Sequence, residues 1–188
     1  MKLSCTKENL SQGLSITSHI STKNVNLPIL NNVLLKADQG GLKLISTNLE
    51  IALTCSVRGK LEQQGEYTVP SKLFYEFVSL LPDDVVNMDL HDDGLFVSCA
   101  KAKTTINGIS PAEFPLIPPV EGEVKFEVNV SDFKKALAQT LFATAMNEAR
   151  PELTGVYMKF EDEKLIMAAT DSYRLSEVEI KTPSREQE

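Results

Sequence analysis

The stretch MAATDSYRL, Met167–Leu175, repeats the pattern of an earlier stretch of the same chain, LISTNLEIA, Leu44–Ala52. The two stretches lie 123 positions apart and align without a gap. In both, apolar residues lead to a threonine that is followed by Asp171 or Asn48. Short polar side chains of this kind favour a tight connection between strands, because they form hydrogen bonds with nearby backbone groups. The two stretches therefore predict a fold that contains the same strand connection twice.

The similarity continues along the chain at the same offset of 123 positions. Residues of the same kind coincide in the pairs Lys2–Lys125, Leu3–Phe126, Leu10–Phe133, Leu14–Leu137, Pro28–Pro151, Leu30–Leu153, Val33–Val156, Leu42–Leu165 and Thr47–Thr170. A register kept over so many positions indicates a duplicated unit of about 123 residues. The second copy reaches Glu188, the counterpart of Gly65, so the repeat predicts one domain followed by the first half of another.

A proline-rich segment, SPAEFPLIPPVEG (residues 110–122), separates the two copies. Prolines favour an extended and stiff connector. We therefore expect a domain boundary here, with a first domain over residues 1–122 and the first half of a second domain over residues 123–188.

Each copy is predicted to open with a short alternating strand, KLSCT or KFEVNV, followed by a helix. In the second copy Ser131 is placed to cap this helix, and apolar or small residues then recur on one helical face: Phe133, Ala136, Leu137, Thr140, Leu141 and Thr144. In the first copy the helix is followed by predicted strands over residues 29–37, 42–47 and 50–59. After Gly65 the pattern runs again, with a strand over 66–70, a helix from Ser71 that Pro82 ends, and strands over 85–90, 95–100 and 103–109.

Short turns between these strands favour antiparallel pairing. The predicted fold class is α+β, in which each unit has two strand-helix-strand-strand-strand halves and two helices cover one side of an antiparallel sheet. In the helix from Ser71, the expected core-facing residues are Leu73, Phe74, Phe77, Leu80 and Leu81, and the expected outward residues are Lys72, Glu76 and Ser79.

Composition indicates a protein that folds in water. Of the 188 residues 42% are hydrophobic and 24% are charged, and no long apolar run is present. The first residues, Met1–Cys5, contain no apolar stretch of signal-peptide length, so we expect a cytoplasmic protein without a membrane partner.

The charge distribution limits the kinds of partner. The formal net charge is −7, with −2 over residues 1–120 and −5 over the remainder. Such a balance argues against a protein that binds nucleic acid by bulk positive charge, so a DNA-binding role must use local lysines.

Metal and histidine chemistry have little support in the sequence. Cys5, Cys55 and Cys99 are widely spaced in apolar or alternating segments, which favours buried free thiols. His19 and His91 are isolated as well. No metal site, cofactor or catalytic residue is expected.

Together these segments resemble the bacterial sliding clamp family, the β subunit of DNA polymerase III holoenzyme. The resemblance covers the whole chain through LPILNNVLL, STNLEIAL, VPSKLFYEFVSLLPDD, GISPAEFPLIP, RPELTGVYMKF and MAATDSYRL, in this order and spacing. It implies a clamp built of three such domains, of which two chains close head to tail into a homodimeric ring around duplex DNA. This chain then corresponds to the first domain and half of the central one. The ring would tether the replicative polymerase without catalysing a reaction.

The resemblance also implies a set of DNA-facing residues: Lys23, Asn24, Lys72, Lys134, Lys135, Asn147 and Arg150. Lysines on polar helix faces suit contact with phosphates that does not depend on base sequence. Two alternatives remain open, because these lysines also suit an ordinary solvated surface and Arg150 has Glu148 and Glu152 nearby for an ion pair.

A pocket for short peptide tails of polymerases, the clamp loader and repair proteins is implied by the resemblance at Leu153, Thr170, Ser172, Tyr173, Arg174 and Leu175. Apolar walls of such a pocket take up a leucine or aromatic side chain of the partner. The first copy has Glu50 and Ile51 in place of Tyr173 and Arg174, so we expect the pocket in the second copy alone. Ser172 replaces a glycine common in the family, and a positive φ there would strain a serine.

The edge at which the ring closes is implied to contain Phe74, Lys103, Thr104, Thr105 and Ile106. An exposed strand edge is a ready template for pairing with another chain.

Two other functions fit parts of the sequence. The same pocket would serve a peptide-binding adaptor that does not encircle DNA, and changing Lys72 and Arg150 would leave such an adaptor unaffected. Asp171, Tyr173 and Arg174 can also be drawn as an acid, a phenol and an anion clamp of an enzyme. No paired base, phosphate loop or metal set accompanies these three residues, which argues against catalysis.

Overall fold

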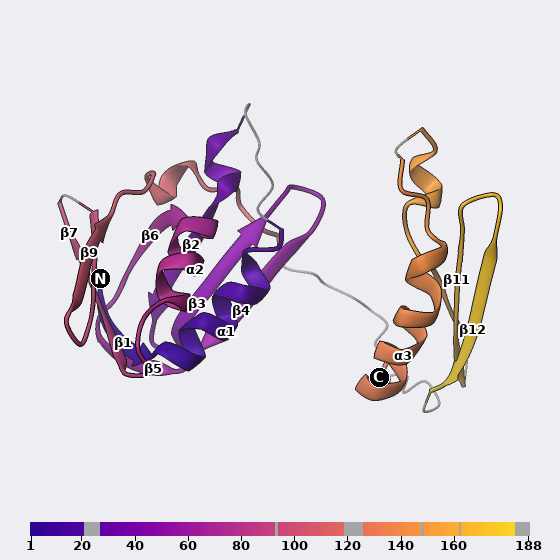
Figure 1. Ribbon diagram of the computed structural model, residues 1–188, viewed down its shortest axis with the longest axis horizontal. Coiled ribbons are helices and arrows are strands. Elements are labelled where there is room, and N and C mark those ends of the chain that lie inside the picture. Colours follow the sequence, from indigo (N-terminus) through magenta and orange to yellow (C-terminus); the bar gives the residue numbers. More distant parts are fainter. Residues whose placement is uncertain (21–26, 93, 119–125, 148, 162, 183–188) are drawn as a thin grey trace. The chain divides into compact units, whose positions relative to one another are not determined.

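The structure is a computed structural model that describes residues 1–20, 27–92, 94–118, 126–147, 149–161 and 163–182 (Figure 1). The chain divides into two compact units, Met1–Pro118 (unit 1) and Pro119–Glu188 (unit 2). No described helix is both long enough and apolar enough to cross a membrane.

Unit 1 contains two antiparallel sheets and two helices. Its elements are β1 (Lys2–Thr6), α1 (Lys7–Thr17), β2 (Asn32–Asp38), β3 (Gly41–Thr47), β4 (Ala52–Val57), β5 (Gly59–Gln63), β6 (Gly65–Pro70), α2 (Ser71–Ser79), β7 (Val85–His91), β8 (Gly94–Cys99) and β9 (Ala102–Ile106), with short 3-10 turns at Pro28–Asn31 and Pro111–Glu113. The strand orders are β5-β1-β7-β8-β9 and β4-β3-β2-β6. The α+β class and the antiparallel pairing are confirmed.

The two halves of unit 1 are interlocked. The first strand of the first half, β1, pairs with β7 of the second half, and the first strand of the second half, β6, pairs with β2 of the first. The helices α1 and α2 lie side by side, and Figure 1 shows both of them over the strands. Neither half therefore completes its own sheet.

One continuous apolar core joins both halves of unit 1. The side chains of Leu10 and Leu14 on α1 and of Phe74 and Val78 on α2 are fully buried in it. Burying side chains of this size contributes about 1.5–3 kcal/mol each, which is the main force that holds the helices on the sheets.

The predicted core-facing stripe of α2 was partly wrong. The buried residues are Ser71, Phe74 and Val78, followed by Leu81 just after the helix, whereas Leu73 and Leu80 are 54% and 87% exposed. A nine-residue helix buries one narrow row at spacings of three and four, and an apolar side chain outside that row remains in solvent.

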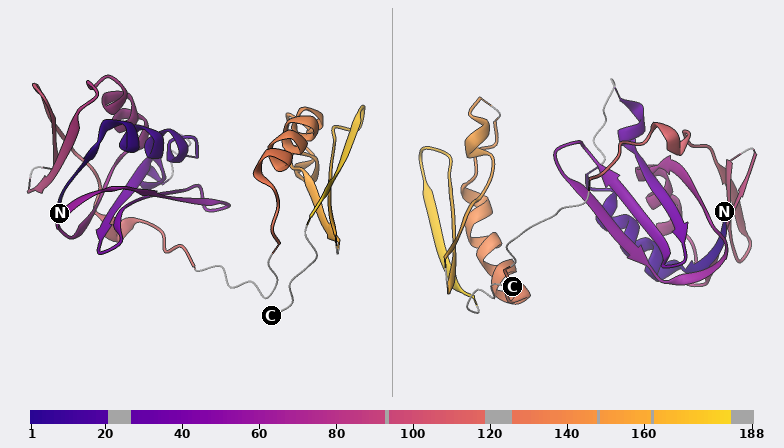
Figure 2. Two further views of the ribbon diagram at one scale, coloured as in Figure 1. Left: turned by 90° about the horizontal axis from the view of Figure 1, so that it is seen from below. Right: turned by 180° about the vertical axis from the view of Figure 1, so that it is seen from behind.

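Unit 2 has one helix on one three-stranded antiparallel sheet (Figure 2). Its elements are α3 (Val130–Thr140), 3-10 turns at Leu141–Ala143 and Pro151–Leu153, β10 (Tyr157–Glu161), β11 (Lys164–Thr170) and β12 (Leu175–Lys181). The sheet has the order β10-β11-β12. Ala136, Leu165 and Met167 form a small core against which α3 and the sheet pack.

The start and the end of α3 differ from the prediction. Asn129, rather than Ser131, caps the helix, because its side-chain oxygen accepts hydrogen bonds from the backbone N–H groups of Ser131 at 2.9 Å and Asp132 at 3.4 Å. The α-helix ends at Thr140, and a 3-10 turn continues the apolar pattern as far as Ala143.

Candidate functional site

The turn from Thr170 to Arg174 joins β11 to β12 and is closed by its own side chains. The Thr170 hydroxyl donates a hydrogen bond to the carbonyl of Arg174 at 2.7 Å and accepts one from the N–H of Ser172 at 3.1 Å. Oδ1 of Asp171 accepts from the N–H groups of Tyr173 at 3.0 Å and Arg174 at 2.9 Å. Four hydrogen bonds therefore fix the shape of this turn.

The first copy forms the same turn with the same bonds. Thr47 donates to the carbonyl of Ile51 at 2.8 Å and accepts from the N–H of Leu49 at 3.0 Å. Oδ1 of Asn48 accepts from the N–H groups of Glu50 at 3.1 Å and Ile51 at 2.9 Å. The strand connection that the repeat predicted is confirmed in both copies.

The third residue of each turn has a left-handed backbone. The φ angle is 77° at Leu49 and 78° at Ser172. Residues with a Cβ are strained in this region, and glycine is not. The strain expected at Ser172 is therefore present, and the four hydrogen bonds hold it in place.

The Arg174 side chain reaches across the turn to Asp171 and remains 54% exposed. Its Nε forms an ion pair with Oδ2 of Asp171 at 2.9 Å, and its guanidinium carbon lies 5.6 Å from the centre of the Phe142 ring. The pKa of Asp171 is lowered, first because the backbone N–H groups of Tyr173 and Arg174 donate to its carboxylate, and then because of the Arg174 charge.

Arg150 also contacts the turn from Thr170 to Arg174. Its Nε lies 3.2 Å from Oε1 of Glu152, and its Nη1 donates to the Ser172 hydroxyl at 3.1 Å. Of the two acidic partners considered from the sequence, Glu152 is the one that Arg150 contacts, and Glu148 lies outside the described residues. The pKa of Glu152 is lowered, mainly by its own backbone N–H and then by Arg150.

Beside the turn lies a mostly apolar hollow with a volume of about 340 Å³. It is lined by Glu152, Leu153, Gly155, Val156, Tyr157, Ala168, Ala169, Thr170 and Leu175. Three predicted pocket residues, Leu153, Thr170 and Leu175, are among them. Ser172, Tyr173 and Arg174 do not line this hollow, and the Tyr173 side chain is 98% exposed.

The segment after α3 carries two further exposed apolar side chains that were not predicted as part of the pocket. Phe142 is 57% exposed and Met146 is 97% exposed, and both follow α3 in the chain. The lining residues that were not predicted are Glu152, Gly155, Val156, Tyr157, Ala168 and Ala169. The alternation of β11 gave a signal for Ala168, since it places this residue on the opposite face of the strand from the buried Met167 and Ala169.

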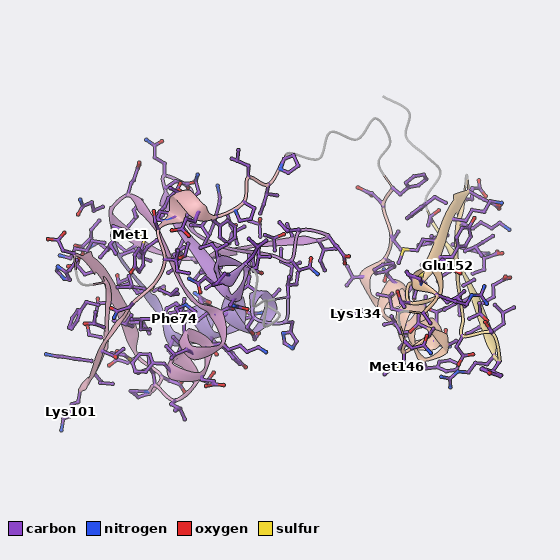
Figure 3. The ribbon with its side chains drawn as sticks, turned by 90° about the horizontal axis from the view of Figure 1, so that it is seen from above. Met1, Phe74, Lys101, Lys134, Met146 and Glu152 are labelled. Carbon is purple, nitrogen blue, oxygen red and sulfur yellow. The ribbon has the colours of Figure 1, made fainter. Side chains whose placement is uncertain are left out.

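The predicted DNA-facing lysines are exposed. Lys72 lies on α2, and Lys134 and Lys135 lie on α3, from which Lys134 projects outward (Figure 3). None of these three forms an ion pair within the described part of the chain. Asn147 is exposed too, whereas Lys23 and Asn24 lie outside the described residues.

Two residues predicted for the ring edge are in the core instead. Phe74 is fully buried, as its interior position in Figure 3 also shows, and Ile106 is 4% exposed. Lys103 and Thr105 are exposed and Thr104 is half-buried on β9, which is an outer strand of its sheet. Leu73 on α2 and Leu80 just after it are the large apolar side chains exposed in this segment.

Among the described residues, no group of three or more His, Cys, Asp or Glu side chains is arranged to hold a metal ion. Burial raises the pKa of the Cys5 thiol to about 12, which makes this group a poor nucleophile.

Comparison with known proteins decides the family. Residues 1–118 match the model of the DNA polymerase III beta subunit, N-terminal domain, and residues 127–188 match that of its central domain. The chain belongs to the DNA polymerase III beta subunit family.

Curated clamp relatives are similar to this chain along most of its length. The beta sliding clamp of Synechococcus elongatus is 36% identical over 181 residues, which cover 95% of this chain and 48% of the relative. That of Bacillus subtilis is 26% identical over 185 residues, which cover 94% and 49%. The chain therefore spans about half the length of the curated clamps that it matches.

Solved clamp structures share the fold. The DNA polymerase III beta subunit of Thermotoga maritima aligns with a TM-score of 0.92 at 26% identity and covers 100% of this chain and 51% of that one. A Pseudomonas aeruginosa sliding clamp bound to griselimycin aligns with a TM-score of 0.89 at 26% identity and covers 99% and 52%. The duplicated strand-helix units of this chain are thus those of the clamp fold.

Proposed function

We propose that this chain acts in bacterial DNA replication as part of a sliding clamp, a non-catalytic ring that encircles duplex DNA and tethers the replicative polymerase. The observation that carries the proposal is the match of both units, in order, to the N-terminal and central domains of the DNA polymerase III beta subunit. An acidic chain suits this role. A closed ring is retained on DNA because the DNA is threaded through it, so weak contacts with phosphates are sufficient.

The hollow on unit 2 is proposed to bind short peptide tails of the polymerase, the clamp loader and repair proteins. Leu153, Val156 and Leu175 supply apolar wall, and Thr170 is fixed at the rim by the hydrogen-bonded turn. A leucine or aromatic side chain buried there contributes about 1.5–3 kcal/mol. The exposed Phe142 and Met146 extend the apolar surface available to a peptide, and Tyr173 offers an aromatic face beside it.

DNA contact is proposed to use Lys72, Lys134, Lys135 and Asn147, with Lys23 and Asn24 as further candidates from the sequence. All of the described members are exposed. Arg150 is divided between the two roles, since its guanidinium contacts Glu152 and Ser172 at the turn. A DNA phosphate near Arg150 would have to compete with the Glu152 carboxylate.

The closing edge of the ring is proposed to lie on β9 and α2. The free edge of β9 offers backbone groups to a strand of another chain, with Lys103 and Thr105 exposed beside it. Leu73 and Leu80 would then be covered by the partner in place of the buried Phe74.

The peptide-binding part is tested by titrating the chain with a short peptide that contains a leucine and a phenylalanine. In NMR spectra, we expect the amide signals of Ala168, Thr170 and Leu175 to shift, and those of Ile45, Thr47 and Ala52, their counterparts in the first copy, to stay in place. The same peptide with both apolar residues changed to alanine is the control. Equal shifts in the two turns would contradict the proposal.

The DNA part is tested by the salt dependence of duplex binding. Reversal of charge in Lys134→Glu/Lys135→Glu is expected to weaken binding equally for unrelated duplex sequences. It should also lower the slope of log K against log salt by about 0.9 for each DNA phosphate that the variant no longer neutralises. The control is Lys159→Glu/Lys181→Glu, on strands β10 and β12. An unchanged slope in the α3 variant would show that Lys134 and Lys135 do not neutralise DNA phosphates.

A further inference from the structure

The hollow on unit 2 carries a single charge. Its described lining residues are apolar or small except for Tyr157, Thr170 and Glu152. The Thr170 hydroxyl is already engaged in the turn, where it donates to one backbone group and accepts from another. Glu152 is thus the one charged side chain among the described residues that line the hollow, and this side chain is 62% exposed. A peptide that enters the hollow therefore meets a negative charge beside the apolar walls.

The charge of Glu152 is neutralised by Arg150, two positions earlier in the chain. The Arg150 guanidinium divides its contacts, because Nε lies 3.2 Å from Oε1 of Glu152 and Nη1 donates to the Ser172 hydroxyl at 3.1 Å. Among the described contacts, one nitrogen thus meets one carboxylate oxygen, without the two parallel bonds that make arginine–carboxylate pairs strong. The Arg150 side chain is also 60% exposed. Exposed pairs of this kind shift an equilibrium by about fivefold at most, so another cation can replace Arg150.

Glu152 keeps its charge and its place when Arg150 leaves. The pKa of its carboxyl group is lowered first by its own backbone N–H, and only then by Arg150. Its backbone lies in the 3-10 turn Pro151–Leu153, where the Leu153 N–H donates to the Arg150 carbonyl at 3.0 Å. The Leu153 carbonyl accepts from the N–H of Ala145 at 2.9 Å, which ties this turn to the segment after α3. The carboxylate is therefore a preformed acceptor for a cation.

The first copy of the repeat shows that the fold does not need these polar side chains. It has apolar residues at all three corresponding positions, with Leu27, Ile29 and Leu49 in place of Arg150, Glu152 and Ser172. The strand connection of the first copy nevertheless forms with the same four hydrogen bonds. A 3-10 turn also precedes its strands, as it does in the second copy. A set of polar contacts that the fold can omit is a candidate for a role in binding.

The surroundings of the hollow favour a positively charged ligand. The chain carries a formal net charge of −5 beyond residue 120. Arg174, the cation of the neighbouring turn, is paired with Asp171 at 2.9 Å and so does little to offset Glu152. A negative field of this kind attracts basic segments of a partner and repels acidic ones.

We propose that Glu152 selects the peptides that bind the hollow. A preferred tail carries a lysine or arginine next to its leucine or aromatic anchor, and this cation takes the place of Arg150 on the Glu152 carboxylate. The inference rests on the peptide-binding function proposed above. The anchor holds the tail in the hollow and so raises the local concentration of the basic residue beside Glu152. Arg150 stays attached to Ser172 and returns to Glu152 when the tail leaves.

A tail with an acidic residue is the alternative occupant. Its carboxylate would be attracted to Arg150, but Oε1 of Glu152 lies 3.2 Å from Nε of the same guanidinium and would repel it. We therefore expect acidic tails to bind less tightly than neutral ones. The order of affinity among basic, neutral and acidic tails distinguishes selection by Glu152 from selection by Arg150.

The first experiment compares three peptides that share one leucine and one phenylalanine. They differ in the residue next to the leucine, which is lysine, glutamine or glutamate. Isothermal titration of the chain should give an affinity for the lysine peptide about two to five times that for the glutamine peptide, and a lower affinity for the glutamate peptide. The ratio of lysine to glutamine affinity should fall toward one at high salt. Equal affinities for these two peptides, or tightest binding of the glutamate peptide, overturns the inference.

Variants separate selection by Glu152 from a general effect of charge. In Glu152→Gln the ratio of lysine to glutamine affinity should fall to about one. The matched control is Glu163→Gln, which removes an exposed carboxylate outside the hollow and should keep the ratio. Arg150→Ala should raise the ratio, because the cation of the peptide no longer competes with Arg150. A ratio that Glu152→Gln leaves unchanged, or that Glu163→Gln lowers equally, overturns the inference.

The same titrations tell a failure of this inference from a failure of the proposed function. If all three peptides bind equally well, the hollow remains a peptide site and Glu152 takes no part in selection. If none of them binds, and the amide signals of Ala168, Thr170 and Leu175 stay in place, the peptide-binding function is wrong and the inference with it.

Discussion

Leu49 and Ser172 occupy the same position in the two copies of the repeat and share one backbone conformation, with φ angles of 77° and 78°. Four hydrogen bonds surround each of them in the same pattern. The left-handed residue is thus a property of the turn and does not depend on which side chain stands there.

This relationship predicts that Leu49→Gly stabilises unit 1. Glycine removes the steric strain of a left-handed leucine, and the 59% exposed side chain gives little packing in return. The net gain should be about 0.5–1 kcal/mol in the free energy of unfolding, measured with urea. Leu49→Ala removes the side chain and keeps the strain, so it should leave stability nearly unchanged. A gain of equal size in both variants would show that exposure, and not the backbone, is the cause.

Thr47 and Thr170 allow the effect of the turn on peptide affinity to be separated from its effect on stability. Thr170→Val removes one donor and one acceptor from the turn beside the hollow, and we expect peptide affinity to fall about tenfold because the turn loosens. Thr47→Val removes the same two bonds in unit 1 and should lower stability without changing peptide affinity. Isothermal titration of both variants with one peptide checks this, and a loss of affinity in Thr47→Val would argue against a site confined to unit 2.

The lowered pKa of Asp171 predicts a dependence on acid. A carboxylate whose pKa is lower in the folded state stabilises that state above its ordinary pKa, and this contribution is lost as the pH falls through the folded value. Asp171→Asn keeps an oxygen for the two backbone N–H groups, as Asn48 does in the first copy. The chain should therefore be more stable than Asp171→Asn near neutral pH, and the difference should shrink in acid. A difference in unfolding temperature that is constant with pH would contradict this.

Helix α2 and the residue that follows it offer a direct comparison of a buried and an exposed apolar residue. Phe74→Ala should cost about 3–5 kcal/mol of stability, because it empties a fully enclosed part of the core. Leu80→Ala, at an 87% exposed position, should change stability by less than about 0.5 kcal/mol. Urea unfolding of both variants measures the contrast, and a large loss in Leu80→Ala would mean that this side chain is covered in solution.

Much of the fold could be predicted from the sequence because the patterns that indicate its strands and helices occur in both copies of the repeat. The buried positions Leu10, Leu14, Leu165 and Met167 and both strand connections follow from alternation and helical spacing. The row buried by α2 could not be predicted in the same way, because both Leu73 and Phe74 are apolar and the packing against β2 and β6 selects one of them. For α3, two nearby polar residues were available as caps, and Asn129 rather than Ser131 takes the position.

The candidate site was predictable to a smaller extent. Leu153, Thr170 and Leu175 came from resemblance and line the hollow, whereas Tyr173 and Arg174 lie outside it. The contact of Arg150 with Ser172 joins residues 22 positions apart, and no local pattern in the sequence indicates it. Such contacts follow from how the turn after β11 and the loop before β10 meet in three dimensions.

The exchange of first strands within unit 1 also sets the order in which this chain becomes structured during synthesis. Lys2, in the first strand, pairs with Asp89, so β1 waits for most of the unit to emerge from the ribosome before it gains this neighbour. Pairings between such distant residues slow folding and join it into one cooperative step. The N-terminal half of unit 1 therefore cannot complete its sheets until β7 has been made.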